Sequence, residues 1–188
     1  MPERVFYPLQ VAQKQHDEQF HPDIYYLDYP RRMTHFVLHF AKYAGRLAEM
    51  TGAPDPKRLE QTLADNFIVV LAASDVLNLD FDQRLTSAHG EPPKPTLAAW
   101  CAHVARGESV SPEAVPEWWM MKLVPPTGEM AKALESLDHM EPLNVREMLT
   151  KGLLAVLVST LATAHFLRVD LEKLTRDRWD EVARRRLL

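Results

Sequence analysis

The stretch PRRMTHFVLHFAKYAGRLAEM, residues 30–50, decides the fold class. Its apolar residues recur at intervals of three and four, which places them on one face of an α-helix. Proline is favoured in the first turn of a helix, so Pro30 marks the start. The stretch therefore predicts one long amphipathic helix. The residues on its apolar face are Phe36, Val37, Phe40, Ala44 and Leu47.

The rest of the chain carries further helix starts and no convincing strand. Capping residues and prolines recur just before apolar segments of helical period, and Asn144 with Glu147 forms a capping box. Pro125 and Pro126 are expected to interrupt the helix that precedes them. We predict an all-α helical bundle. Further helices are expected from Asp55-Pro56, Asp80, Thr96, Ser111-Pro112, Thr127, Asn144 and Asp170.

The composition fits a compact soluble protein. Of 188 residues, 46% are apolar and one is cysteine, so a core can form without metal or disulfide staples. The net charge of −4 gives no general attraction to nucleic acid or anionic lipid. The most apolar run, residues 152–167, is shorter than the roughly 20 residues that span a bilayer and is expected to be a buried helix. We expect a cytoplasmic protein without membrane or nucleic-acid partners, since no targeting segment is evident.

A proline-rich stretch divides the chain into two similar halves. Residues 87–96 contain three prolines and form the best candidate hinge, which gives halves at 1–90 and 91–188. Residues 42–49 align with 125–132, and 63–81 align with 153–171. We predict two helical repeats packed as a pseudo-dimer within one compact unit. A chance similarity between helical bundles is the alternative.

The aligned segments also resemble a known enzyme family. The sequence LADNFIVVL, residues 63–71, runs on to Leu79-Asp80-Phe81 and is similar to the second metal helix of the MazG family of all-α nucleoside triphosphate pyrophosphohydrolases. In the second half, Gly128-Glu129-Met130 resembles the family's E-E-x-G-E-L helix, and Val169-Asp170-Leu171 resembles the start of its tail. The resemblance implies a helical fold and Mg²⁺-dependent hydrolysis through E-E-x-x-E and E-x-x-D carboxylates.

This chain departs from that acidic pattern. Lys42, Tyr43 and Arg46 stand where the three glutamates of the first half belong, and Thr62 replaces the next one, so that Asp65 alone remains. In the second half, the same positions hold Pro125, Pro126, Glu129, Gly152 and Ala155. Neither half keeps a carboxylate cage for a metal ion. We therefore expect a degenerate metal site and name no metal ligand and no cofactor.

A polar stripe replaces the acidic set on the first helix. His35, His39, Lys42, Arg46 and Glu49 step by four, three, four and three residues and share one face. If that face points into the bundle, its cations can hold phosphate groups without a metal. A solvated helix face is the alternative, and a transition-metal chelate is a weaker one. The predicted ligand-binding residues are His35, His39, Lys42, Arg46 and Asp65, and the chelate would join His35 and His39 to Asp65 or Glu49.

Three other groups of residues attract attention. Trp118 and Trp119 adjoin two methionines, which predicts either core packing or contact with another surface. Cys101 and His103 are read as helix-packing residues and not as a nucleophile with its base. The histidines and tyrosines of residues 16–29 are expected to form a structured loop without an assigned chemistry.

Three functions are left open. The first is a nucleotide- or phosphate-binding protein with a regulatory or accessory role. The second is a divergent pyrophosphohydrolase that uses Mg²⁺ with Asp65, Glu49 and Glu129. The third is an interaction protein that assembles with itself or a protein partner through Trp118 and Trp119.

Overall fold

The computed structural model describes residues 4–186. Over this range the chain forms nine α-helices and one 3₁₀ helix, with no strand, so the all-α prediction is confirmed. The α-helices are α1 (Phe6–Phe20), α2 (Pro22–Tyr25), α3 (Tyr29–Met50), α4 (Pro56–Leu77), α5 (Phe81–His89), α6 (Leu97–Val104), α7 (Val115–Asp138), α8 (Val145–Leu167) and α9 (Leu171–Arg186), and the 3₁₀ helix η1 is Pro112–Ala114.

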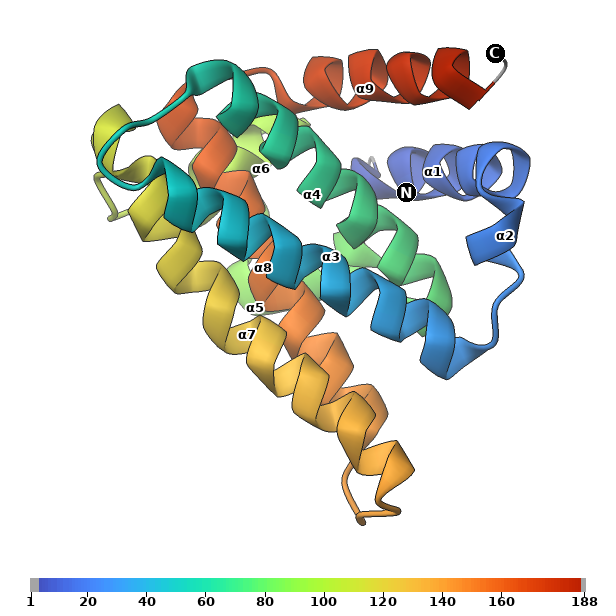
Figure 1. The fold of residues 1–188 in the computed structure, drawn as a ribbon. Coiled ribbons are helices and arrows are strands. Elements are labelled where there is room, and N and C mark those ends of the chain that lie inside the picture. Colours follow the sequence, from blue (N-terminus) through green and yellow to red (C-terminus); the bar gives the residue numbers. More distant parts are fainter. Residues whose placement is uncertain (1–3, 187–188) are drawn as a thin grey trace.

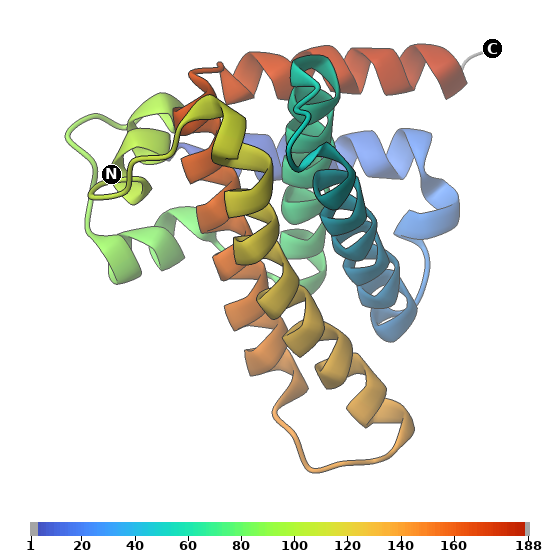
Figure 2. The same cartoon turned by 60° about the vertical axis from the view of Figure 1, so that its left-hand side comes forward.

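Four long helices form the body of the molecule, and the first and last helices lie beside it. Helices α7 and α8 run side by side as an antiparallel hairpin, and α3 packs against both α4 and α7 (Figure 1). Helix α4 also contacts α8. Helices α1 and α9 lie next to each other, and both contact α4 (Figure 2). The first and last helices therefore cover α3 and α4 on one side.

Most of the helix starts that the sequence predicts are confirmed. The side chains of Asp55, Asp80, Asn144 and Asp170 each accept a hydrogen bond from the backbone N–H three residues later. These bonds satisfy donors that the first turn of a helix leaves free. Ser111 is different because its side chain makes no capping bond. The segment after it is the 3₁₀ helix η1, which leads into α7.

The expected interruption at Pro125 and Pro126 is wrong. Helix α7 continues through both prolines. Proline removes the N–H that would bond the carbonyl four residues earlier, here those of Met121 and Lys122. Both of these residues are exposed, so water can replace the missing donors. The helix tolerates the pair because the gap in its hydrogen bonding lies on the solvent side.

The expected N-terminal loop is also wrong, because residues 6–20 form α1. Val5, the residue that precedes this helix, makes no side-chain cap. The cap comes instead from Asp82 on α5, whose carboxylate accepts from the backbone N–H groups of Val5, Phe6 and Tyr7 at 2.8–3.1 Å. A local reading of the sequence misses such a cap, since its donor and acceptor lie more than 70 residues apart.

Helix α8 lies in the core, as predicted for the apolar run. Within residues 4–186, it is the one single helix whose length and composition would allow it to cross a membrane. Two thirds of its most apolar window is buried in the fold. Leu153, Val156, Leu157 and Leu161 are fully buried, and the helix packs against α4, α6 and α7. The apolar composition is therefore explained by packing inside the bundle.

The aligned segments of the two halves end in the same way. Asn78 after α4 and Arg168 after α8 both adopt the left-handed conformation, with φ of 48° and 55°. Each is followed two residues later by an aspartate that caps the next helix. Between the halves, the Asn66 amide on α4 donates to the Thr160 hydroxyl on α8 at 2.7 Å, inside the core. The pseudo-dimer arrangement itself stays a prediction.

Candidate functional site

The polar stripe of α3 lines a cavity of about 250 Å³. His35, His39, Lys42 and Arg46 form one wall, and Asp65 on α4 faces them. Helices α1, α2 and α9 supply the remaining walls. The five predicted ligand-binding residues thus come together around one space. The other main polar residues that line it are Gln13, His16, Asp17, His21, Arg178 and, from the start of α3, Arg32.

Asp65 joins three helices through two ion pairs. Its Oδ1 accepts from Nε of Arg178 on α9 at 2.6 Å, and its Oδ2 accepts from Nη1 of Arg46 at 3.3 Å. The side chains of Asp65 and Arg178 are only 13% and 14% exposed. Arg178 also donates to Glu181 at 2.6 Å. Burial lowers the pKa of Arg178, but its bonds to the two carboxylates outweigh this, so the pKa is raised.

His39 is held in its neutral form by burial and by neighbouring positive charges. Its Nδ1 lies 3.0 Å from the Tyr43 hydroxyl and 3.1 Å from Nζ of Lys42. A protonated amine only donates, so Nδ1 is the acceptor and the proton sits on Nε2. The pKa of His39 is lowered to about 4, first by burial and then by the positive charges of Lys42, His35 and Arg46. The imidazole is therefore neutral at pH 7.

Lys42 and Arg32 hold positive charge that the fold does not fully neutralise. Within residues 4–186, Lys42 has no carboxylate oxygen within 4 Å of its Nζ. The Arg32 side chain is only 9% exposed, and its Nη1 pairs with Asp75 at 3.3 Å. Its Nε and Nη2 are buried without a hydrogen-bond partner in the same range. A buried donor without a partner costs free energy of folding. These nitrogen atoms can therefore donate to an acceptor that enters the cavity.

Sequence reasoning missed Arg32 and Arg178. Arg178 is one of several arginines in the last helix that are interleaved with acidic residues, a pattern that indicates a solvated surface. A usable signal was its position next to Trp179, an aromatic residue that the bundle buries. Arg32 lies near the start of α3, three residues before His35, and thus on the face of the polar stripe.

The three carboxylates of the alternative hydrolytic site do not converge. Asp65 lies in the cavity with each oxygen bonded to an arginine. Glu49 is exposed and pairs with Arg58. Glu129 is exposed on α7 and does not line the cavity. In the family's E-x-x-D position of α8, an ideal Cβ on Gly152 would lie 2.4 Å from Cγ of Met130, which leaves no room for a carboxylate there.

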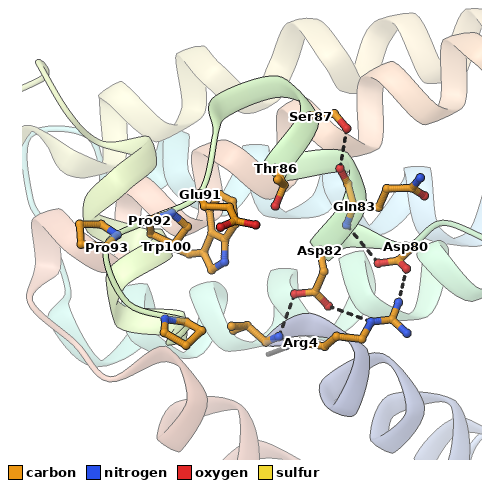
Figure 3. Close-up of a pocket in the computed structure, with 12 residues that line it drawn as sticks. Arg4, Asp80, Asp82, Gln83, Thr86, Ser87, Glu91, Pro92, Pro93 and Trp100 are labelled. Carbon is orange, nitrogen blue, oxygen red and sulfur yellow. Dashed lines mark hydrogen bonds and ion pairs between the residues drawn. The ribbon is translucent and has the colours of Figure 1, made fainter. Parts of the chain in front are cut away.

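A second and larger cavity of about 810 Å³ lies between α5, the start of α1 and the proline-rich segment after α5 (Figure 3). Its charged groups Arg4, Asp80 and Asp82 already have partners. Asp82 caps α1, and Arg4 points toward Asp80 and Asp82 and pairs with both. The third acid on its wall is Glu91. This cavity therefore has a structural polar cluster, and its acidic balance disfavours phosphate.

The remaining sequence candidates lie in packed regions. Trp119 is fully buried, and Trp118 packs edge-on against Phe166 with ring centroids 5.0 Å apart. In this conformation Trp119 cannot contact a partner. Cys101 is buried, and burial raises the pKa of its thiol to about 12. His103 bonds the carbonyl of His89 at 2.8 Å and lies beside Arg106, so both of its ring nitrogens are engaged away from this thiol.

Comparison with known protein families, with curated proteins and with solved structures found no match for this chain.

Proposed function

We propose that this chain binds a phosphorylated ligand of the nucleotide class in the cavity under α3, in a regulatory or accessory role. The observation that carries the proposal is the unbalanced charge. Lys42 lacks a carboxylate partner within the described range, and Arg46 shares its Asp65 carboxylate with Arg178, which also pairs with Glu181. Four cations, including Arg32, thus line one small space.

The chemistry of these groups favours phosphate over a neutral ligand. Guanidinium groups bind phosphate oxygens in a bidentate way, and a lysine adds a point charge. The unpaired nitrogen atoms of Arg32 require acceptors. Phosphate groups bound at Lys42 or at Arg32 would supply negative charge where the fold supplies too little.

The volume suggests which part of the ligand is enclosed. At about 250 Å³, the cavity is smaller than most sites that enclose a drug-sized molecule. The phosphate groups would fill it, and a nucleoside would lie at its opening. Tyr25, a half-buried residue whose ring lies against the Arg32 guanidinium, lines the same cavity and offers aromatic surface for a base.

The proposal includes descent from a MazG-like hydrolase whose metal site has been rebuilt. Its support is the cation at the position of a metal-binding glutamate and the ion pairs that occupy Asp65. Hydrolysis with Mg²⁺ would need two or three carboxylates within reach of one ion. We therefore propose binding without turnover.

A calorimetric titration with adenosine triphosphate, deoxyadenosine triphosphate, inorganic pyrophosphate and adenosine tests the proposal. We expect binding of the phosphorylated compounds and none of adenosine. Lys42→Gln is expected to weaken binding roughly tenfold, because one charge-assisted contact is lost. Lys122→Gln is the matched control, since Lys122 is exposed on α7 and pairs with Glu108 outside the cavity. Equal loss in both variants, or no binding by the wild type, overturns the proposal.

Pyrophosphate release with Mg²⁺ or Mn²⁺ separates binding from hydrolysis. The same triphosphates are incubated with the wild type and with Asp65→Asn. No release by either protein is the expected result. Turnover that disappears in Asp65→Asn would establish the hydrolase instead and would show that the two arginines release Asp65 during the reaction.

A further inference from the structure

Three side chains of the types that bind metal ions lie close together at the end of α1, apart from the polar stripe of α3. One ligand atom from each of His16, Asp17 and His21 lies within 4.8 Å of the other two. Helix α1 ends at Phe20, and the backbone N–H of His21 donates to the carbonyl of Asp17 at 2.8 Å. The chain then turns into α2 (Figure 1). This turn brings His21 back beside the last turn of α1.

His16 is held as metal-binding histidines are held. Its Nε2 lies 3.3 Å from the backbone carbonyl of Trp179. A carbonyl only accepts, so Nε2 carries the proton and Nδ1 presents its lone pair. Nδ1 is buried and has no hydrogen-bond partner within residues 4–186. Stacking on Trp179 and contact with Phe20 fix the ring plane. A metal-bound histidine commonly donates its second N–H to a carbonyl in this way.

Asp17 is oriented by a chain of hydrogen bonds from the last helix. Trp179 Nε1 donates to the Gln13 carbonyl oxygen at 2.5 Å, and the Gln13 amide donates to Oδ1 of Asp17 at 2.8 Å. The Asp17 residue is 9% exposed. A buried carboxylate needs a compensating positive charge, and a bound cation would supply one.

We propose that His16, Asp17 and His21 bind one divalent transition-metal ion, of the Zn²⁺ class, at the α1 end of the cavity. Two imidazole nitrogens and one carboxylate oxygen suit Zn²⁺ or Co²⁺ and do not suit Mg²⁺, which prefers oxygen ligands. Tetrahedral Zn²⁺ places its ligand atoms roughly 3.4 Å apart. The three ligand atoms, now within 4.8 Å of one another, would therefore move slightly closer together around the ion. A fourth position faces the cavity and accepts water or an anion.

Charges of both signs surround the proposed metal site. Asp180 on α9 adds negative potential at His16, whereas Arg32 acts on Asp17 with the opposite sign. The site is distinct from the i, i+4 pair of His35 and His39, where the ammonium of Lys42 lies 3.1 Å from His39 and repels a cation. The inference goes beyond the proposed function and does not depend on it.

Titration of the metal-free, untagged chain with Co²⁺ and with Zn²⁺ tests this site without any nucleotide present. We expect one ion per chain, visible ligand-field absorption with Co²⁺, and thermal stabilisation by Zn²⁺, because the ion binds only the folded form. His21→Ala is expected to weaken Co²⁺ binding at least about tenfold. His139→Ala, an exposed histidine on the loop after α7, is the matched control and should bind Co²⁺ as the wild type does.

His16→Gln provides a second variant, with circular dichroism as the check that both variants are folded. Folded His16→Gln and His21→Ala proteins that keep wild-type Co²⁺ affinity would overturn the site. Loss of binding in His35→Ala with no loss in His21→Ala would also overturn it and would place the ion on the α3 stripe. Failure of nucleotide binding has no bearing on either result, since no nucleotide enters this titration.

Discussion

The helix pairs α3–α4 and α7–α8 align in sequence, yet only one of them encloses a polar space. In the first pair, Arg46 on α3 and Asp65 on α4 bond across the cavity. The aligned residues in the second pair are Glu129 and Ala155, and both are exposed. Helices α1 and α9 cover the first pair. The difference shows that α1 and α9 complete the site around α3 and α4 and that an aligned helix pair alone does not form it.

The interior of the two pairs differs as well. Thr62 on α4 is buried and its hydroxyl bonds the carbonyl of Arg58 at 2.8 Å. Its aligned residue on α8 is Gly152, which lies directly against Met130 of α7. The second pair is therefore packed too closely for a side chain at the position where the first pair holds a threonine.

The largest expected effect comes from filling that contact with Gly152→Val. An ideal Cβ at Gly152 lies 2.4 Å from Cγ of Met130 and 3.2 Å from the carbonyl oxygen of Pro126. Met130 is fully buried, so its side chain must repack or the two helices must separate. Urea denaturation should show a free energy of unfolding lower by about 3 kcal/mol.

Gly128→Val is the matched control on the same helix hairpin. Gly128 is exposed, and no atom lies within 4 Å of a Cβ built there. Its effect should stay within about 0.5 kcal/mol. A similar loss in both variants would show that the close approach at Gly152 does not set the packing of the second pair.

Asp65→Asn tests the charged contact of the first pair. The change leaves Arg46 and Arg178 without their shared carboxylate in a partly buried position. The free energy of unfolding should fall by about 2 kcal/mol, as measured by urea denaturation. Ala155→Asn, at the aligned and exposed position of α8, should cost only about 0.5 kcal/mol. Equal losses would contradict the view that α9 makes the two pairs different.

The smallest effect concerns the acid response of the first pair. The pKa of His39 in the fold is about 4, below its ordinary value of 6.5. The unfolded chain therefore binds more protons between these values, so this histidine's contribution to stability is complete above pH 6.5 and is lost as the pH falls to about 4. Since the ring keeps some contact with water, we expect about 1 kcal/mol.

Denaturation at several pH values between 4 and 7 measures this contribution as a difference between the wild type and His39→Gln. The wild type should lose stability relative to the variant as the pH falls. His139→Gln, an exposed histidine outside the first pair, should follow the wild type. A constant difference between wild type and His39→Gln would show that His39 keeps an ordinary pKa.

The fold could be predicted largely because its signals are local. Caps such as Asp55 and Asn144 lie next to the helices that they start, and the apolar period of residues 30–50 marks the buried face directly. The predictions fail where the decisive contact comes from a residue distant in the sequence, or where water replaces a missing hydrogen-bond donor. Asp82 caps α1 from another helix, and water tolerates the gap at Pro125.

The candidate site was predictable only in part. The α3 stripe could be read from its spacing, because four of its five residues do face one cavity. Spacing within one helix does not tell which other helices cover that face. Arg178 and the α1 histidines come from helices that only the tertiary fold brings to α3, so no pattern local to residues 30–50 could include them.

The cap that Asp82 supplies to α1 has a consequence for cooperativity. Helix α1 takes its N-terminal cap from α5, and its Gln13 takes a hydrogen bond from Trp179 on α9. Helix α1 thus depends on α5 for its N-terminal cap and on α9 for the hydrogen bond at Gln13. Loss of α9 would remove both Trp179 and Arg178 and with them the wall of the cavity that α9 forms. We therefore expect local unfolding of α9 and loss of the candidate site to occur together.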